Sequence, residues 1–292
     1  MNRLSRAVQA LLQQRALLVF ILALAGYGGY VYWRHLQNYV STDDAYVGAH
    51  VVPVAAQVAG PVAHLYVRDN SPVRQGERLF EIDTHPFKIA VAAAKARVAE
   101  RQAALVNAEY ISERTAKMAA RRFLSPQASQ NAQTTVQTDR AALQAAKAAL
   151  AQARLDLRHC LVRAATTGYI SSMNVRVGTF IQEGTPLFAL ISSQKYWVTA
   201  NFKETEVEHI RPGEKARIHV DMYPNHPFRG RVESISGGSG TAFSLLPPEN
   251  ATGNWVKVTQ RVPVRIVIVD RDPKWPLRIG TSAVATVYFP RH

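Results

Sequence analysis

The side chains capable of acid–base, nucleophilic or metal chemistry are scattered along the 292-residue chain. None of the nine histidines forms an H-x-x-x-H or H-E-x-x-H pattern, and the single cysteine, Cys160, excludes disulfides within the chain and four-cysteine zinc sites. Gly237–Gly240 lacks the Gly-Lys-Ser/Thr ending of a phosphate-binding loop, which favours a flexible turn. Asp43 and Asp44 are adjacent, and we interpret them as solvated charge. The sequence thus nominates no catalytic residue, metal site or cofactor site.

The net charge of +14 raises the question of a nucleic-acid partner. The excess is spread along the chain, although residues 86–160 hold 12 basic against 5 acidic residues. Neither a compact Lys/Arg run nor a nucleic-acid-binding motif accompanies it. We therefore expect no nucleic-acid partner.

The first forty residues contain a candidate membrane anchor. Ala16 to Trp33 is a run of 18 residues without a charge, the lower limit for a helix that crosses the hydrocarbon core. Arg3, Arg6 and Arg15 precede it, so the positive-inside rule predicts a cytoplasmic N-terminus and an exported body. Aromatic residues mark the outer end, as in an interfacial belt: Tyr27, Tyr30, Tyr32 and Trp33.

A cleaved signal peptide is the alternative for this segment, because Ala23-Leu24-Ala25 fits a small-residue cleavage site. Apolar and aromatic character continues for eight residues beyond Ala25, which favours an uncleaved anchor. Either interpretation predicts that the body of the protein is exported.

One short β pattern occurs twice in the chain. The stretch GPVAHLYVRDNSPVRQGERLFEI (Gly60–Ile82) aligns without a gap with GYISSMNVRVGTFIQEGTPLFAL (Gly168–Leu190), at a constant offset of 108. We expect the two copies to interlock into one small β module. The aligned glycines are interpreted as structural turns: Gly60, Gly76, Gly168 and Gly184.

The segment between the copies is rich in alanine and lacks glycine from Pro86 to Arg158. Apolar residues recur every seven positions on both sides of the break FLSPQASQN, which predicts two helices folded back as an antiparallel coiled coil. A place in a globular bundle is the alternative, but each helix has one narrow apolar stripe. The heptad residues are Val91, Val98, Leu105, Val136, Leu143, Leu150 and Leu157.

The last third alternates in the manner of β-strands, with five segments between Tyr196 and Phe289. Short strands of this kind predict a small antiparallel barrel. The interruption from Gly237 to Trp255 is apolar for a loop, and we expect it to cover the barrel or a partner such as a transporter. Its candidate contact residues are Phe243, Leu245, Leu246, Asn254 and Trp255.

In the order of these elements, the chain resembles the membrane fusion proteins, the periplasmic adaptors of Gram-negative tripartite exporters. The stretches STDDAYVGAHVVPVAAQVAGPV, VTANFKETEV and FSLLPPENATGNWVKVTQRVPVRI resemble the EmrA branch of the HlyD-type adaptors. The resemblance runs from about Ser41 to Phe289 and implies a mainly β fold plus an α-helical coiled-coil hairpin. It implies five segments: cytoplasmic N-terminus and transmembrane anchor (1–42), first half of a lipoyl-like domain (43–85), hairpin (86–159), second half (160–193) and β-barrel (194–292).

The family also implies partners and a location. Such adaptors are single-pass inner-membrane proteins with a periplasmic body, and they link a drug/proton antiporter of the major-facilitator type to a TolC-type outer-membrane channel. They assemble into rings of three or six subunits. The hairpin replaces the turn that carries the modified lysine in lipoyl domains, so we expect neither lipoyl nor biotin. By resemblance, the channel contacts at the tip are Arg121, Arg122, Leu124, Ser125 and Ser129.

Two other functions compete with export of drugs or other toxic small molecules. The same architecture serves adaptors for aromatic-acid efflux and for protein secretion by ABC transporters. A membrane-anchored periplasmic enzyme belongs to a different class, and it requires a concave group of titratable residues that the sequence does not nominate.

Overall fold

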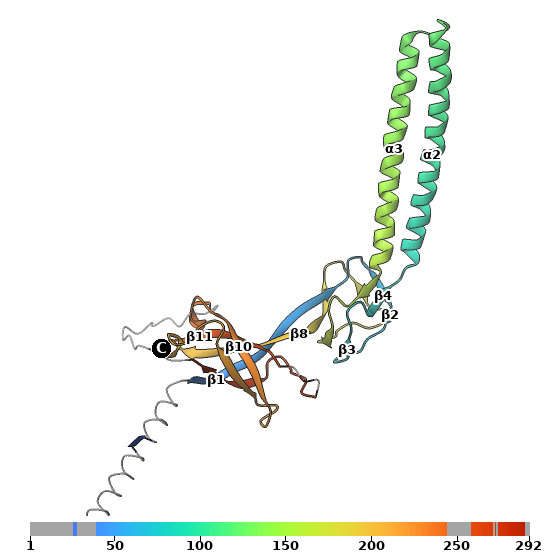
Figure 1. Ribbon diagram of the computed structural model, residues 1–292. Coiled ribbons are helices and arrows are strands. Elements are labelled where there is room, and N and C mark those ends of the chain that lie inside the picture. Colours follow the sequence, from blue (N-terminus) through green and yellow to red (C-terminus); the bar gives the residue numbers. More distant parts are fainter. Residues whose placement is uncertain (1–25, 28–38, 244–257, 271, 273, 290–292) are drawn as a thin grey trace, which may run out of the picture. The chain divides into compact units, whose positions relative to one another are not determined.

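The computed structural model describes residues 26–27, 39–243, 258–270, 272 and 274–289 (Figure 1). Apart from residues 26 and 27, the predicted anchor lies outside these ranges. None of the described helices is both long enough and apolar enough to cross a membrane. The chain divides into two compact units. We call Val51–Gln194 the sandwich unit, and Met1–His50 with Lys195–His292 the barrel unit.

The two copies of the β pattern exchange strands in the sandwich unit. In the first copy these strands are β2 (Gly60–Leu65), β3 (Pro72–Val73) and β4 (Arg78–Ile82). Their counterparts in the second copy are β6 (Gly168–Ser171), β7 (Phe180–Ile181) and the start of β8 (Pro186–Lys203). β2 pairs with β7, and β3 pairs with β6, so each copy supplies a strand to the other.

The exchange obeys the offset of the sequence repeat. Gly60 lies opposite Ile181, and the equivalent pair in the other copy is Gly168 opposite Val73. Gly76 donates its N–H to the carbonyl of Ala164 at 2.8 Å, and Gly184 donates equivalently to Ala56 at 2.9 Å. The module is therefore pseudo-twofold symmetric and contains both copies, as the repeat predicts.

One apolar core lies between the interlocked copies. Leu79, Phe80 and Ile82 from the first copy are fully buried, and Leu190 from the second copy is equally inaccessible. The rings of Phe80 and Phe188 meet edge to face, with centroids 6.0 Å apart. Because the core takes residues from both copies, neither copy can bury its apolar face alone.

The four glycines that we interpreted as turns divide into two kinds. Gly76 and Gly184 lie in turns with φ of +81° and +76°, where residues with a Cβ are strained. The interpretation is wrong for Gly60 and Gly168, which begin strands β2 and β6. A Cβ on Gly168 would collide with the carbonyl oxygen of Ile191, so glycine here permits close approach of two strands.

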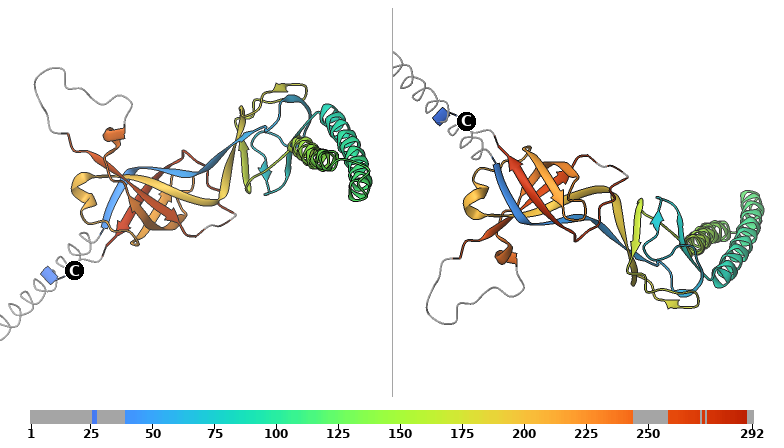
Figure 2. Two further views of the ribbon diagram at one scale, coloured as in Figure 1. Left: turned by 90° about the horizontal axis from the view of Figure 1, so that it is seen from above. Right: turned by 90° about the horizontal axis from the view of Figure 1, so that it is seen from below.

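Two long helices leave the sandwich unit between the copies. α2 (His85–Ala120) and α3 (Pro126–His159) lie side by side, and Figure 2 shows them from two directions. Thirty-six residues make α2 about 54 Å long. The predicted seam is buried along its middle, at Leu105, Leu143 and Leu150. Beside it Ala108 and Ala146 are also buried, and their small side chains allow close packing. The hairpin closes at its base, where Ile82 donates its N–H to the carbonyl of Cys160 at 2.9 Å.

Among the described residues, six strands close the barrel unit. β12 (Ser282–Tyr288), β9 (Lys215–Val220), β10 (Pro227–Ile235), β11 (Arg261–Ile268) and β8 follow one another, and β1 (Tyr39–Ala55) pairs with both β8 and β12. We expected a barrel from residues 194–292, but the sixth strand comes from the N-terminal side. Inward residues alternate with outward ones and fill the interior, including Val198, Phe202, Ile218, Val264, Ile266, Ala285 and Val287.

The turn glycines of the two copies yield a matched test. Gly76→Val and Gly184→Val should each lower the free energy of unfolding by about 1–2 kcal/mol, because both force a β-branched residue to positive φ. Thermal denaturation of the full chain, followed by circular dichroism, measures the effect. Gly237→Val is the control, because Gly237 has ample space and no positive φ. Loss of stability from one turn variant and none from the other would contradict the conclusion that the two copies form one β module.

Candidate functional site

The single cysteine of the chain is not exposed for nucleophilic chemistry. Cys160 is buried, its Sγ donates to the carbonyl of Asp156 at 3.4 Å, and desolvation raises the pKa of its thiol to about 11. The thiol is therefore protonated at neutral pH and is a poor nucleophile. In the described part of the chain, no group of three or more His, Cys, Asp or Glu side chains is placed to hold a metal ion.

Asp44 is not the freely solvated charge that we expected. The strand β1 bulges between Thr42 and Ala45, and the bulge places Asp44 against the neighbouring strands. Asn201 donates to its carboxylate at 3.0 Å, and the Arg261 guanidinium lies 3.4 Å away. Arg261 also donates to the carbonyl of Asn201 at 3.0 Å. This network ties β1, β8 and β11 together, so Asp44 has a structural role in the barrel.

The tip of the hairpin is a tight helix ending. The N–H of Phe123 bonds to the carbonyl of Met118 (3.0 Å), and the N–H of Arg122 bonds to that of Ala119 (2.9 Å). These two bonds define a Schellman motif. Arg122 occupies the left-handed position with φ of +62°, where glycine is usual. Arginine instead of glycine at this strained position favours a role for its side chain.

The other predicted tip residues have different environments. Leu124 is 38% exposed, whereas its neighbour Phe123 is 73% exposed. Ser125 caps α3, since its hydroxyl oxygen accepts the N–H of Ala128 at 3.3 Å. Ser129 lies in the first turn of α3 and is half-buried. We did not predict Phe123 as a contact, although it stands between two predicted contacts in the sequence and is more exposed than Leu124.

A second heptad stripe runs along the outer side of α2. Its members recur at alternating steps of three and four, as in a coiled-coil seam. Ile89, Val106 and Tyr110 are 57%, 55% and 64% exposed, respectively, so this stripe is unpaired in a single chain. A hollow of about 640 Å³ lies along its distal half. We call this stripe the outer seam: Ile89, Ala92, Ala96, Ala99, Ala103, Val106 and Tyr110.

α3 carries a complementary stripe with the same alternating steps. Its threonine hydroxyls are used within the helix, because Thr134 and Thr138 donate to carbonyls four residues earlier at 3.0 Å. Only methyl groups therefore remain for packing. We call this set the small-residue stripe: Thr134, Thr138, Ala141, Ala145 and Ala148, all exposed.

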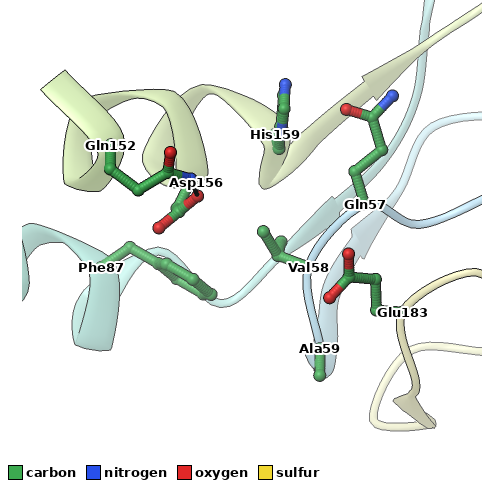
Figure 3. A pocket seen from close by; sticks show the side chains of 8 residues that line it. All are labelled: Gln57, Val58, Ala59, Phe87, Gln152, Asp156, His159 and Glu183. Atoms are coloured by element: carbon green, nitrogen blue, oxygen red, sulfur yellow. Dashed lines mark hydrogen bonds between the residues drawn. The ribbon is translucent and has the colours of Figure 1, made fainter.

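A hollow of about 600 Å³ lies where the hairpin meets the β strands (Figure 3). Asp156 and His159 come from the end of α3, Phe87 from the start of α2, and Glu183 from the turn before β8. The remaining lining residues are Gln57, Val58, Ala59 and Gln152. The side-chain amide of Gln152 donates to the carboxylate of Asp156 at 2.8 Å. The carboxylates of Asp156 and Glu183 add negative charge to this hollow, at the base of a hairpin that is otherwise basic.

The predicted barrel loop is mostly outside the described residues. Leu245, Leu246, Asn254 and Trp255 fall in the undescribed range 244–257. The loop begins with a 3-10 turn, Gly240–Phe243, which Thr241 ties to Gln260 through a 2.7 Å hydrogen bond. The tie fixes the entry of the loop beside β11.

Comparison with known proteins identifies the family. Residues 50–193 match the family described as "RND MFP, barrel-sandwich hybrid domain", and residues 195–288 match "AAEA-like beta-barrel domain". The chain is 35% identical to the probable multidrug resistance protein EmrK of Escherichia coli K12, over 93% of this chain and 83% of that protein. It is also 35% identical to the multidrug export protein EmrA of Haemophilus influenzae, over 94% and 84%. The chain belongs to the membrane fusion protein family.

Solved structures agree with the fold of a membrane fusion protein. The membrane fusion protein Spr0693 of Streptococcus pneumoniae R6 superposes with a TM-score of 0.65 at 16% identity, over 87% of this chain and 99% of that one. MacA of Actinobacillus actinomycetemcomitans gives 0.60 at 17% identity, over 87% and 80%. These likenesses concern the fold.

The strained tip residue of this membrane fusion protein can be tested directly. Arg122→Gly should raise the free energy of unfolding by about 1 kcal/mol, because glycine relieves the left-handed strain. The control Arg121→Gly should lower it by about 0.5–1 kcal/mol, because Arg121 has an ordinary φ of −86°. Chemical denaturation of both variants measures the difference. Equal effects would contradict the Schellman geometry.

Proposed function

We propose that this protein is the periplasmic adaptor of a tripartite efflux pump that exports drugs or other toxic small molecules. The observation that carries the proposal is membership of the membrane fusion protein family, with similarity to EmrK and EmrA along almost the whole chain. A body of two β units and a projecting coiled coil suits an adaptor that contacts other proteins. The partners are an inner-membrane antiporter of the major-facilitator type and a TolC-type channel.

The proposed location is the inner membrane, with one anchor and a periplasmic body. The support is the uncharged run from Ala16 to Trp33 and the arginines before it. The first described strand of the body, β1, begins at Tyr39, five residues beyond Arg34. An anchor keeps the adaptor beside its transporter regardless of ligand.

A ring of identical subunits would pair the two unpaired helix stripes. In a ring the outer seam of one copy can pack against the small-residue stripe of the next. The Glu109–Arg140 ion pair (3.2 Å) shows which residues of α2 and α3 lie at the same height. Neighbouring copies in a ring lie at equal heights. Asp156 of one copy is therefore level with the segment between Lys88 and Lys95 of the next. Charge complementarity at the base therefore favours the same register as the apolar contact.

The tip is the proposed contact with the outer-membrane channel. Phe123 and Leu124 are exposed apolar side chains on the turn, with Arg121 and Arg122 beside them. Apolar anchors usually dominate an interface, whereas single exposed charges at its rim contribute little. We expect the apolar pair to provide most of the docking free energy.

The ring can be tested with two substitutions on one helix. Val106→Asp places a charge in the outer seam and should weaken self-association at least about tenfold, or about 1.4 kcal/mol. Ile111→Asp is the control, because Ile111 is 44% exposed but lies off the seam. Sedimentation of the full chains in detergent measures the association. Equal association of the Val106→Asp variant and the native chain would contradict this interface.

The adaptor function can be tested at the tip. Leu124→Asp should reduce drug resistance and cross-linking to the channel in cells, since a buried carboxylate costs about 2 kcal/mol or more of docking free energy. Arg121→Gln should have a much smaller effect, because it changes one exposed charge. Immunoblots verify expression of both variants. Full resistance with undiminished cross-linking in the Leu124→Asp strain would show that docking occurs elsewhere.

A further inference from the structure

The outer face of the barrel contains like charges in opposed positions. In the pairing of β9 with β10, Arg217 lies opposite Arg229 and Lys215 lies opposite Arg231. All four side chains are exposed on the outward face. Like charges directly opposite each other destabilise a sheet. Two such pairs in succession therefore favour a role in binding over a role in folding.

Only one of the four cations is matched by a carboxylate among the described residues. Asp270 accepts bonds from the backbone N–H and Nε of Arg229 at 2.6 and 2.9 Å. The guanidinium of Arg231 donates to the carbonyl of Gly213 at 3.1 Å. We call the three cations without a described acidic partner the basic patch: Lys215, Arg217 and Arg231.

The basic patch continues into aromatic and hydroxyl side chains along the same rungs of the sheet. Lys215 lies opposite Tyr288 on β12, and Tyr288 lies opposite Tyr39 on β1, with ring centroids 6.2 Å apart. Arg217 stands over the ring of Tyr288 at 5.7 Å. A row of two cations, Arg231 and Lys215, followed by two tyrosines thus crosses four adjacent strands.

The position of this row in the sequence suggests what it faces. Tyr39 follows the last residue of the predicted anchor, Trp33, by six residues, which can span at most about 20 Å. If the anchor is in the membrane, as the proposed function requires, Tyr39 lies within that distance of its outer surface. Tyrosine is enriched at membrane–water interfaces because its ring is apolar and its hydroxyl is polar.

We propose that the basic patch binds the phosphate groups of anionic phospholipids in the membrane that holds the anchor. Guanidinium groups match phosphate oxygens in a two-pronged geometry, and basic groups close to a bilayer are attracted to anionic headgroups. Lipid contact relieves the repulsion within the basic patch. The end of the barrel beside Tyr39 then rests on the bilayer, which limits how far the body can tilt about its anchor.

The test uses the full chain in lipid nanodiscs with and without phosphatidylglycerol in phosphatidylcholine. A water-soluble acylating reagent modifies exposed lysines, and mass spectrometry measures the rate at Lys215. We expect the rate to fall at least about threefold when phosphatidylglycerol is present. Lys147, exposed on α3, is the internal reference and should not change. Equal rates at Lys215 in both lipids would overturn the proposal.

Two double variants assign the effect. Arg217→Gln with Arg231→Gln should abolish the lipid-dependent protection of Lys215. Arg68→Gln with Arg176→Gln removes the same charge from exposed positions of the sandwich unit and should preserve the protection. Circular dichroism checks that both variants fold. Protection that persists without Arg217 and Arg231 would contradict the assignment.

Two further conditions separate lipid from other anionic partners. Inorganic phosphate at the same total concentration should not protect Lys215, and equal protection by it would argue against a membrane surface. Protection that appears only when a transporter is added to the nanodiscs would make the basic patch a protein contact and overturn the lipid proposal. A separate measurement tests the anchor on which the proposal rests: release of the chain from membranes by alkaline washing would contradict the proposed function itself.

Discussion

Strand exchange between the two copies is the constraint on which the sandwich unit depends. Each copy contributes one short strand to its twin, and the pairings join residues 95 to 121 positions apart, from Val73 with Gly168 to Gly60 with Ile181. Two helices of 36 and 34 residues separate the copies, and loop closure over that length would be entropically costly if the helices were disordered. The folded hairpin returns the chain to its starting point, because Ile82 and Cys160 are hydrogen-bonded across its base.

The same arrangement separates two kinds of stability. The β module has a continuous apolar core that includes Phe80, Ile170 and Leu190. The hairpin has one internal seam of leucine and alanine between its helices, and most of its surface is exposed. Helices of this length gain much of their stability from packing rather than from propensity. Neighbouring copies that covered the outer seam would therefore stabilise the arms as well as assemble the ring.

Local patterns in the sequence were sufficient to predict the repeat, the helices and five barrel strands. The gapless repeat at an offset of 108 predicts that the two copies form one module. The break FLSPQASQN lies where α2 ends and α3 begins. The sixth barrel strand could not be predicted, because the pairing of Tyr39 with Tyr288 spans almost the whole chain. The role of Asp44 was missed for the same reason: its partners are Asn201 and Arg261. The spacing of the outer seam is present in the sequence, but we did not predict it because most of its residues are alanine and not a large apolar residue such as leucine.

Because the hairpin is closed at its base, its length can change without a change in the β module. Because both arms begin and end at one hydrogen-bonded point, a heptad added to each arm preserves both stripes and leaves the β module untouched. Each such pair of insertions lengthens the arm by about 10 Å. The length of the hairpin can therefore change in steps of one heptad per helix. A change in the number of heptads alone can fit one β body to cell envelopes of different thickness.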